Sequence, residues 1–162
     1  MPRGAHLRLL TAPAALLGLV LLAGCGNGAV HVGGYTATDA GQKACPALIG
    51  ALPSHVADQP RRRTSGSKYA AAWGKHAIVL RCGVGKPAHF TKFSACQTTN
   101  GVDWFVPEAT FEDQDADVVM TTIGRSPAVE VRVPASYRPA TAPMVDLAQA
   151  IKRHTREIAP CS

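Results

Sequence analysis

Residues 77–82 read Ala-Ile-Val-Leu-Arg-Cys, a nearly continuous apolar run with the length of a β-strand. Strands of this kind are usually buried on both faces, so the run predicts a central strand of a sheet. A second signal follows at Asn100-Gly101, which stands between residues 97–99 and 102–106. Asn-Gly between two strand-like segments is a strong indication of a β-hairpin. The middle of the chain is therefore predicted to form an antiparallel sheet.

Two further strands are predicted over residues 118–123 and 129–133. In the second of these, valines alternate with Glu130 and Arg132. Because successive side chains of a strand point to opposite faces, the valines are expected to face the core and the two charged residues the solvent. Residues 60–66, which contain Arg61, Arg62 and Arg63, are predicted to be a basic loop or the start of an edge strand.

Helices are predicted at both ends of this sheet. Pro46 suits the first turn of a short helix that Pro53 ends. A longer C-terminal helix is predicted to begin at Thr141, with Pro143 in its first turn. Its apolar stripe comprises Met144, Leu147, Ala148, Ile151 and Ile158. The order predicts a single α+β domain over residues 44–162: an antiparallel sheet of about five strands with both helices packed on it.

Residues 1–24 have the pattern of a lipoprotein signal peptide. A short basic region precedes an apolar run, which ends in Leu22-Ala-Gly-Cys25. This ending has the form of a bacterial lipobox, so we expect cleavage before Cys25 and acylation of its thiol. The protein is then predicted to be anchored on the extracytoplasmic face of the cell membrane, since two acyl chains suffice for stable attachment. The alternative is an ordinary secretory signal with a coincidental cysteine.

Residues 25–43 are predicted to be a flexible tether that starts with the lipidated cysteine. The stretch is rich in glycine and has no apolar period. A flexible chain of this length would hold the domain roughly 25 Å from the bilayer.

Four cysteines remain, an even number in a chain that is predicted to be exported: Cys45, Cys82, Cys96 and Cys161. They are predicted to form two disulfides. Three pairings are possible, and we favour Cys82–Cys96 with Cys45–Cys161. Metal binding and nucleophilic catalysis are the alternatives, but no Cys-x-x-Cys or His-x-x-x-His spacing supports a metal site. We predict no metal and no cofactor.

The composition excludes several classes of protein. Of 162 residues, 46% are hydrophobic and 17% charged, which does not fit a disordered chain, a collagen or a multi-span membrane protein. The 17 Lys and Arg exceed the 11 Asp and Glu. This mild positive charge fits a domain near anionic lipid or wall polymer. The arginines of residues 61–63 lack the aromatic neighbours of a nucleic-acid surface, so no nucleic-acid partner is predicted.

Catalytic motifs are fragmentary. Gly83-Val-Gly-Lys86 resembles the end of a phosphate-binding loop, but Pro87 replaces the Ser or Thr that should follow. Ser65-Gly-Ser-Lys68 matches one motif of penicillin-recognising enzymes, without the others. No catalytic residue is predicted. A hydrolase remains an alternative if His76 or His89 lies beside a carboxylate and a nucleophile.

A binding surface, if one exists, is predicted around two tryptophans and nearby charged residues. The candidates are Arg61, Arg62, Trp73, Arg81, Asp103 and Trp104. For each there is also a structural interpretation. The tryptophans fit a core, and Arg81 fits an ion pair with Asp103 or Glu130.

Trp73-Gly74, Ile-Val-Leu-Arg-Cys-Gly-Val at 78–84 and Asn-Gly-Val-Asp-Trp-Phe at 100–105 resemble an actinobacterial family of exported proteins, the domain-of-unknown-function 3515 family. Arg125 and the segment 129–134 resemble its later block. Lys75-His76 departs from the family pattern, in which an acidic residue and proline are common. The resemblance implies a lipoprotein or secreted protein and transfers no catalytic residue.

Together these features predict a non-enzymatic envelope protein that binds a partner, either another envelope protein or a cell-wall component. The second interpretation is a module that binds wall polymer or a small ligand.

Overall fold

The computed structural model of the protein describes residue 1 and residues 28–161. The predicted signal peptide and the predicted lipidation at Cys25 therefore lie outside the described residues. Among the described residues, no helix is both long enough and apolar enough to cross a membrane.

The main sheet has eight strands, and each neighbouring pair is antiparallel. In spatial order they are β2 (His55–Val56), β3 (Gln59–Arg62), β5 (Ala70–Trp73), β6 (Ile78–Val84), β11 (Ala128–Val133), β9 (Val118–Ile123), β8 (Val102–Phe105) and β7 (Gln97–Thr99). The α+β class and the central place of β6 are confirmed. The expected number of about five strands is wrong. The strands missed are short or consist largely of alanine, so they carry little periodic signal.

The hairpin between β7 and β8 is confirmed at Asn100-Gly101. Both residues have positive φ, 48° and 77°. This is the backbone that a two-residue type I′ turn requires, and Asn and Gly adopt it most easily.

Helix α1 spans Asp39–Ala51, so it begins seven residues before Pro46, which was expected in its first turn. The actual start is set by Thr38, whose side-chain oxygen accepts a hydrogen bond from the Gly41 N–H at 3.2 Å. Pro46 lies inside the helix. The predicted end is confirmed, since the helix stops before Pro53.

Helix α3 spans Thr141–His154 and buries four of the five predicted residues: Met144, Leu147, Ala148 and Ile151. Ile158 is instead 59% exposed. The helix has ended before it, because the backbone becomes extended at Thr155 and then forms β12 (Arg156–Glu157) against β10 (Arg125–Ser126). The remaining helices are short, α2 (Ala109–Glu112) and the 3₁₀ turn η1 (Ala135–Tyr137).

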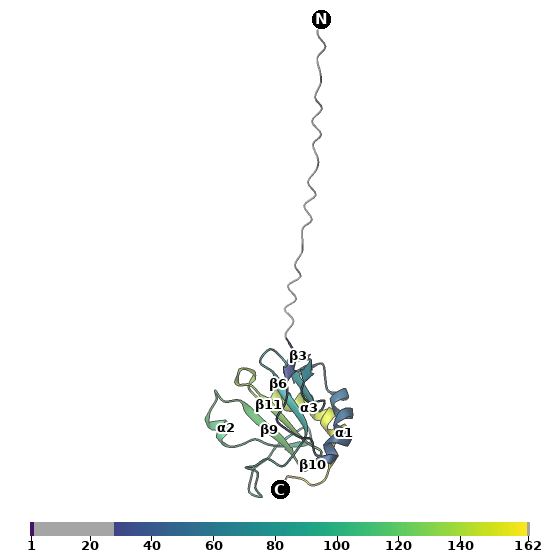
Figure 1. Cartoon of the computed structure of the whole chain (residues 1–162). Helices are drawn as coiled ribbons and strands as arrows, with labels where there is room; N and C mark the ends of the chain where they lie inside the picture. Colours follow the sequence, from purple (N-terminus) through teal and green to yellow (C-terminus); the bar gives the residue numbers. More distant parts are fainter. Residues whose placement is uncertain (2–27, 162) are drawn as a thin grey trace.

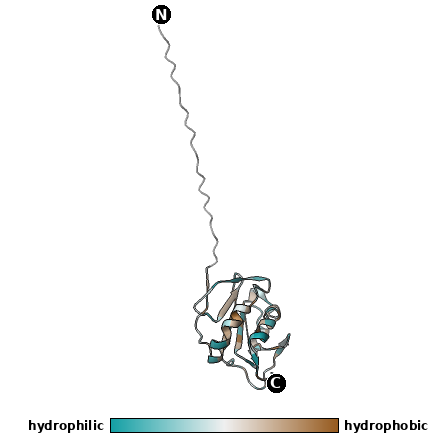
Figure 2. Ribbon diagram, turned by 90° about the vertical axis from the view of Figure 1, so that its right-hand side faces the viewer, coloured by the Kyte–Doolittle hydropathy of each residue, from teal (hydrophilic) through white to brown (hydrophobic). Residues whose placement is uncertain are grey.

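The sheet curls around α3. The helix contacts β2 and β7, which lie at opposite edges of the sheet, and it also packs against α1. Figure 1 shows both helices on one side of the strands. Figure 2 shows brown, apolar segments toward the middle of the domain and teal, hydrophilic ones toward its periphery. One core therefore lies between the two helices and the inner face of the sheet.

The segment that precedes α1 is folded onto the domain. Its strand β1 (Val30–His31) pairs in parallel with β4 (Thr64–Ser65). Val32 is only 2% exposed, and the Tyr35 hydroxyl donates to the carbonyl of Tyr69 at 2.9 Å. The predicted flexible tether is therefore wrong for residues 30–43. This stretch contains so many glycines that the few side chains that pack on the sheet produce no apolar period in the sequence.

Candidate functional site

The two tryptophans of the predicted binding surface lie in the core. Trp73 and Trp104 are fully buried. They occupy inward-facing positions of β5 and β8, and the Trp73 Nε1–H donates to the carbonyl of Pro53 at 3.0 Å. The prediction that they offer a binding surface is wrong, because their apolar area is needed to fill the space beneath α1 and α3.

Arg61 and Arg62 both donate hydrogen bonds to backbone carbonyls of other segments. The Arg61 guanidinium donates to the carbonyls of Ile49 and Leu52, at 2.8 and 3.3 Å. These carbonyls belong to the end of α1, where the helix dipole favours a positive charge.

Arg62 makes a corresponding set of bonds at the start of the domain. Its guanidinium donates to the carbonyls of Gly74 and Lys75, both at 3.1 Å, and of Gly28 at 2.6 Å. The first residues of the domain are thereby fixed to the turn between β5 and β6.

Arg81 pairs with Glu130 on the outer face of the sheet, at 3.1 Å. The guanidinium also lies over the ring of Tyr35, 5.7 Å from its centroid. Of the two predicted partners for Arg81, Glu130 is therefore the one it contacts. Burial raises the pKa of Tyr35 above its ordinary value of 10.0, although its hydrogen bond with Ser67 and the charge of Arg81 act in the opposite direction.

Asp103 ties the hairpin to the end of the chain. Its carboxylate accepts from the Thr98 hydroxyl at 2.6 Å and from the Cys161 backbone N–H at 3.0 Å. The six predicted residues thus do not gather into one surface. Two fill the core, and the charged ones bind backbone or neighbouring side chains at separate places.

All four predicted cysteines are paired, but the favoured pairing is wrong. The disulfides are Cys45–Cys82 and Cys96–Cys161. Cys82 faces α1 from the inner side of β6, while β7, next to Cys96, lies four strands away in the sheet. The helix and strand approach closely, since a Cβ on Gly41 would lie 2.6 Å from the Cα of Gly83.

The histidines of the hydrolase alternative lie apart. The His76 ring packs edge-on against Tyr137, with centroids 5.8 Å apart. His89 is exposed in the loop between β6 and β7. Within residues 28–161, no group of three His, Cys, Asp or Glu side chains is placed to hold a metal ion.

An apolar cleft lies beside the loop between β6 and β7, at a place that no predicted site residue marked. The cleft has a volume of about 760 Å³ and lies between the loop 85–96 and α2. Its apolar lining comprises Phe93, Ala95, Phe105, Val106, Pro107, Ala109 and Phe111. A second hollow of about 450 Å³ adjoins it toward α3 and shares Gln97, Val106 and Phe111. We refer to the two together as the apolar cleft.

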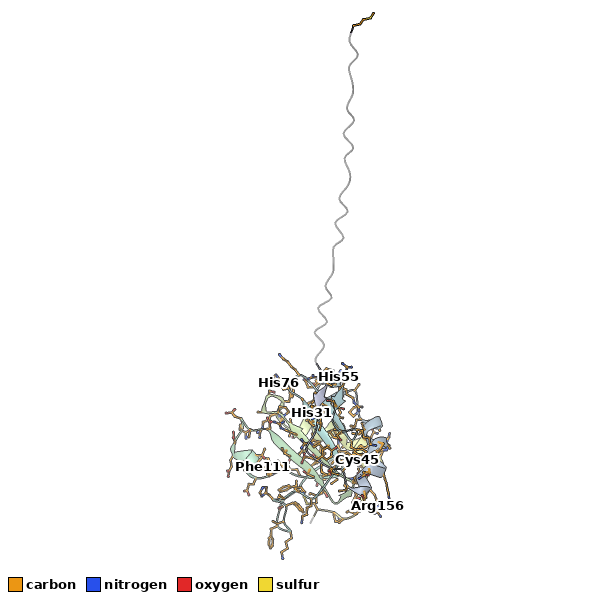
Figure 3. All side chains as sticks on the ribbon, in the orientation of Figure 1. His31, Cys45, His55, His76, Phe111 and Arg156 are labelled. Atoms are coloured by element: carbon orange, nitrogen blue, oxygen red, sulfur yellow. A yellow bond between two sulfur atoms is a disulfide. The ribbon has the colours of Figure 1, made fainter. Side chains whose placement is uncertain are left out.

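Phe93 and Phe111 stand at the rim of the cleft and are 87% and 51% exposed. Figure 3 shows Phe111 projecting at the side of the domain. The loop itself is held in two ways. Phe90 packs edge-on against Phe105 at 5.3 Å, and Cys96 at its end is bonded to Cys161. The cleft is therefore formed by a supported loop that leaves two large apolar side chains uncovered.

The family described as "Protein of unknown function (DUF3515)" matches residues 9–159. The chain belongs to the DUF3515 family. The match covers nearly the whole chain and confirms the resemblance that the motifs around Trp73, β6 and β8 indicated. No curated protein and no solved structure matches it.

In this DUF3515 protein charged side chains stand near the cleft, and Glu108 and Arg138 belong to its lining. The loop supplies Lys86 and Lys92, and α2 begins next to Glu108 and ends at Glu112. The two lysines and the two glutamates are exposed. In the sequence, Phe90 and Phe93 lie in a loop that also contains lysines, and this combination could have indicated the cleft. A loop has no regular period, however, so its side chains could not be predicted to line a binding site.

Proposed function

We propose that this DUF3515 protein is a lipid-anchored protein of the extracytoplasmic face of the cell membrane that binds another envelope protein through the apolar cleft and performs no chemistry itself. The observation that carries the proposal is the exposure of Phe93 and Phe111 at the rim of the cleft. Large exposed apolar side chains around a concavity are typical of interaction sites.

The anchor is supported by the lipobox at Leu22–Cys25. The two disulfides agree with an exported domain, because such bonds persist in oxidising compartments. The exposed charged side chains near the cleft suit a protein partner, since protein interfaces commonly surround an apolar centre with a polar rim.

A small ligand or a segment of wall polymer is the second candidate. It is favoured by the size of the main hollow, since about 760 Å³ lies within the usual range of roughly 300–1,000 Å³ for ligand pockets. The two tryptophans expected to contact such a ligand are buried and take no part in the cleft.

The test is in-cell crosslinking of the full-length protein, followed by purification and mass spectrometry. We expect one recurrent envelope protein, which is lost in the double variant Phe93→Ser with Phe111→Ser. The matched control is Val145→Ser, because Val145 is a 45%-exposed apolar residue of α3 outside the cleft. Recovery of the same proteins with all variants would contradict binding at the cleft.

The anchor is tested separately by labelling cells with a fatty-acid analogue. Label on the wild-type protein and none on Cys25→Ser would support acylation. An unlabelled wild-type protein that is released into the medium would contradict it.

A further inference from the structure

We propose that the end of the domain around Gly28 rests on anionic lipid headgroups of the bilayer, so that the apolar cleft faces away from the membrane. This orientation rests on the proposed acylation of Cys25. It adds to that proposal a membrane-contacting surface and a defined direction for the cleft.

The chain enters the domain at a fixed point. Arg62 donates to the Gly28 carbonyl at 2.6 Å, and the Val30 N–H donates to the carbonyl of Arg63 at 2.9 Å. Only Gly26 and Asn27 separate Gly28 from Cys25. A fully extended chain spans about 3.5 Å per residue, so the acylated residue would lie at most about 11 Å from Gly28.

The surface at this entry point is basic. Residues 55–76, which include β2, β3, β4, β5 and the turn after Trp73, contain five Lys and Arg and one carboxylate, Asp58. A second carboxylate, Asp146 of α3, contacts this segment by accepting from the Ala57 N–H at 2.8 Å, so positive charges still outnumber negative ones. Arg63 and Lys75 are exposed there. Figure 3 shows His31, His55 and His76 at the same end of the domain. The charge of an anionic membrane acts over a Debye length of about 8–10 Å, a distance similar to the reach of the linker.

The cleft lies toward the other end. In Figure 1, β3 and the C-terminus mark opposite ends of the domain, and the loop 85–96 lies near the C-terminus. The disulfide Cys96–Cys161 fixes this neighbourhood. When the basic end contacts the bilayer, the cleft is therefore presented to the envelope.

The experiment uses the full-length, lipidated protein in two kinds of vesicle, phosphatidylcholine alone and phosphatidylcholine with phosphatidylglycerol. A neutral amine-reactive reagent modifies exposed lysines, and mass spectrometry gives the rate at each one. We expect Lys75 to react roughly fivefold more slowly in the anionic vesicles at low salt, and to recover at high salt. Lys92, in the cleft loop, should react equally in both.

Two matched charge reversals sharpen the result. Arg63→Glu should restore the reactivity of Lys75, whereas Lys86→Glu, the same change of charge at the cleft end, should leave it low. Arg63→Gln provides a milder second variant, and thermal melting confirms that each variant is folded. Equal reactivity of Lys75 in both vesicles, or slowed reaction of Lys92 instead, would overturn the orientation.

Flotation with phosphatidylcholine vesicles separates the two proposals. Protein that does not float lacks the anchor, and then the proposed function fails. Protein that floats while Lys75 stays unprotected retains the anchor but not the orientation.

Discussion

The two ends of the domain use the same kinds of residue in opposite ways. Around Gly28 and Trp73, arginines donate to backbone carbonyls and the aromatic ring is buried. Around the cleft, Phe93 and Phe111 are uncovered, and the lysines of the loop bind no carboxylate within the described residues. In a sequence, arginine and tryptophan suggest a binding site, but at this end of the domain they stabilise the fold. The candidate binding surface comes from a loop and a single helical turn.

The largest expected contrast is between a buried and an exposed aromatic side chain. Trp104→Ala should lower the free energy of unfolding by about 3–5 kcal/mol, because it removes a fully buried ring and leaves a cavity. Phe93→Ala should change it by less than about 0.5 kcal/mol. Urea unfolding of both variants measures the difference. Similar losses would mean that Phe93 is covered in solution.

The two disulfides are expected to differ next. Replacing Cys45 and Cys82 with Ala should cost about 3–5 kcal/mol, since it releases a 37-residue separation and empties a site in the core. Replacing Cys96 and Cys161 releases a longer separation of 65 residues, but both cysteines are partly exposed and leave no core cavity.

The loss for the second pair should therefore be smaller, about 2–3 kcal/mol. Replacing Cys96 and Cys161 should also raise the rate of amide hydrogen exchange in the loop 85–96 without changing that of α1. A larger loss for Cys96–Cys161 would show that loop length outweighs burial.

Tyr35, in the segment between β1 and α1, is expected to make the stability of the domain depend on pH. Because burial raises its pKa in the folded protein above the ordinary 10.0, its contribution to stability is complete below that pH. The contribution is lost as the pH rises through the folded-state pKa. Tyr35→Phe should cost about 1 kcal/mol near neutral pH and should show a weaker loss of stability above about pH 10. Urea unfolding across this range tests it; parallel curves for the two proteins would contradict it.

The smallest effect is expected for the ion pair on the outer face. Arg81 and Glu130 are both partly exposed, so Arg81→Met should cost less than about 1 kcal/mol. The loss should shrink further at high salt, in contrast to the salt-independent effect of Trp104→Ala. A double-mutant cycle with Glu130→Gln isolates the pair, and a coupling well above 1 kcal/mol would contradict the expectation.

The sequence predicted the features that have a local physical cause. The apolar run at β6 and the Asn-Gly turn were readable because strand burial and positive φ restrict the residue types. The strands β2 and β5 have only two and four residues, too few for a period to emerge. The cysteine pairing depended on which face of β6 meets α1, and this is decided by tertiary packing. The cleft could not be predicted because one of its walls is a loop, and loops have no regular sequence period.

One consequence of the curled sheet concerns the order in which the chain is made. Helix α3 follows all the strands of the main sheet in the chain, yet strands from both edges of that sheet pack against it. Until residues 141–154 are available, α1 can cover β6, but the apolar inner side toward both edges of the sheet has no cover. A growing chain exposes it to water and to other chains. Completion of the core therefore waits for the synthesis of α3. Truncations that remove α3 should yield an aggregating product and not a smaller folded domain.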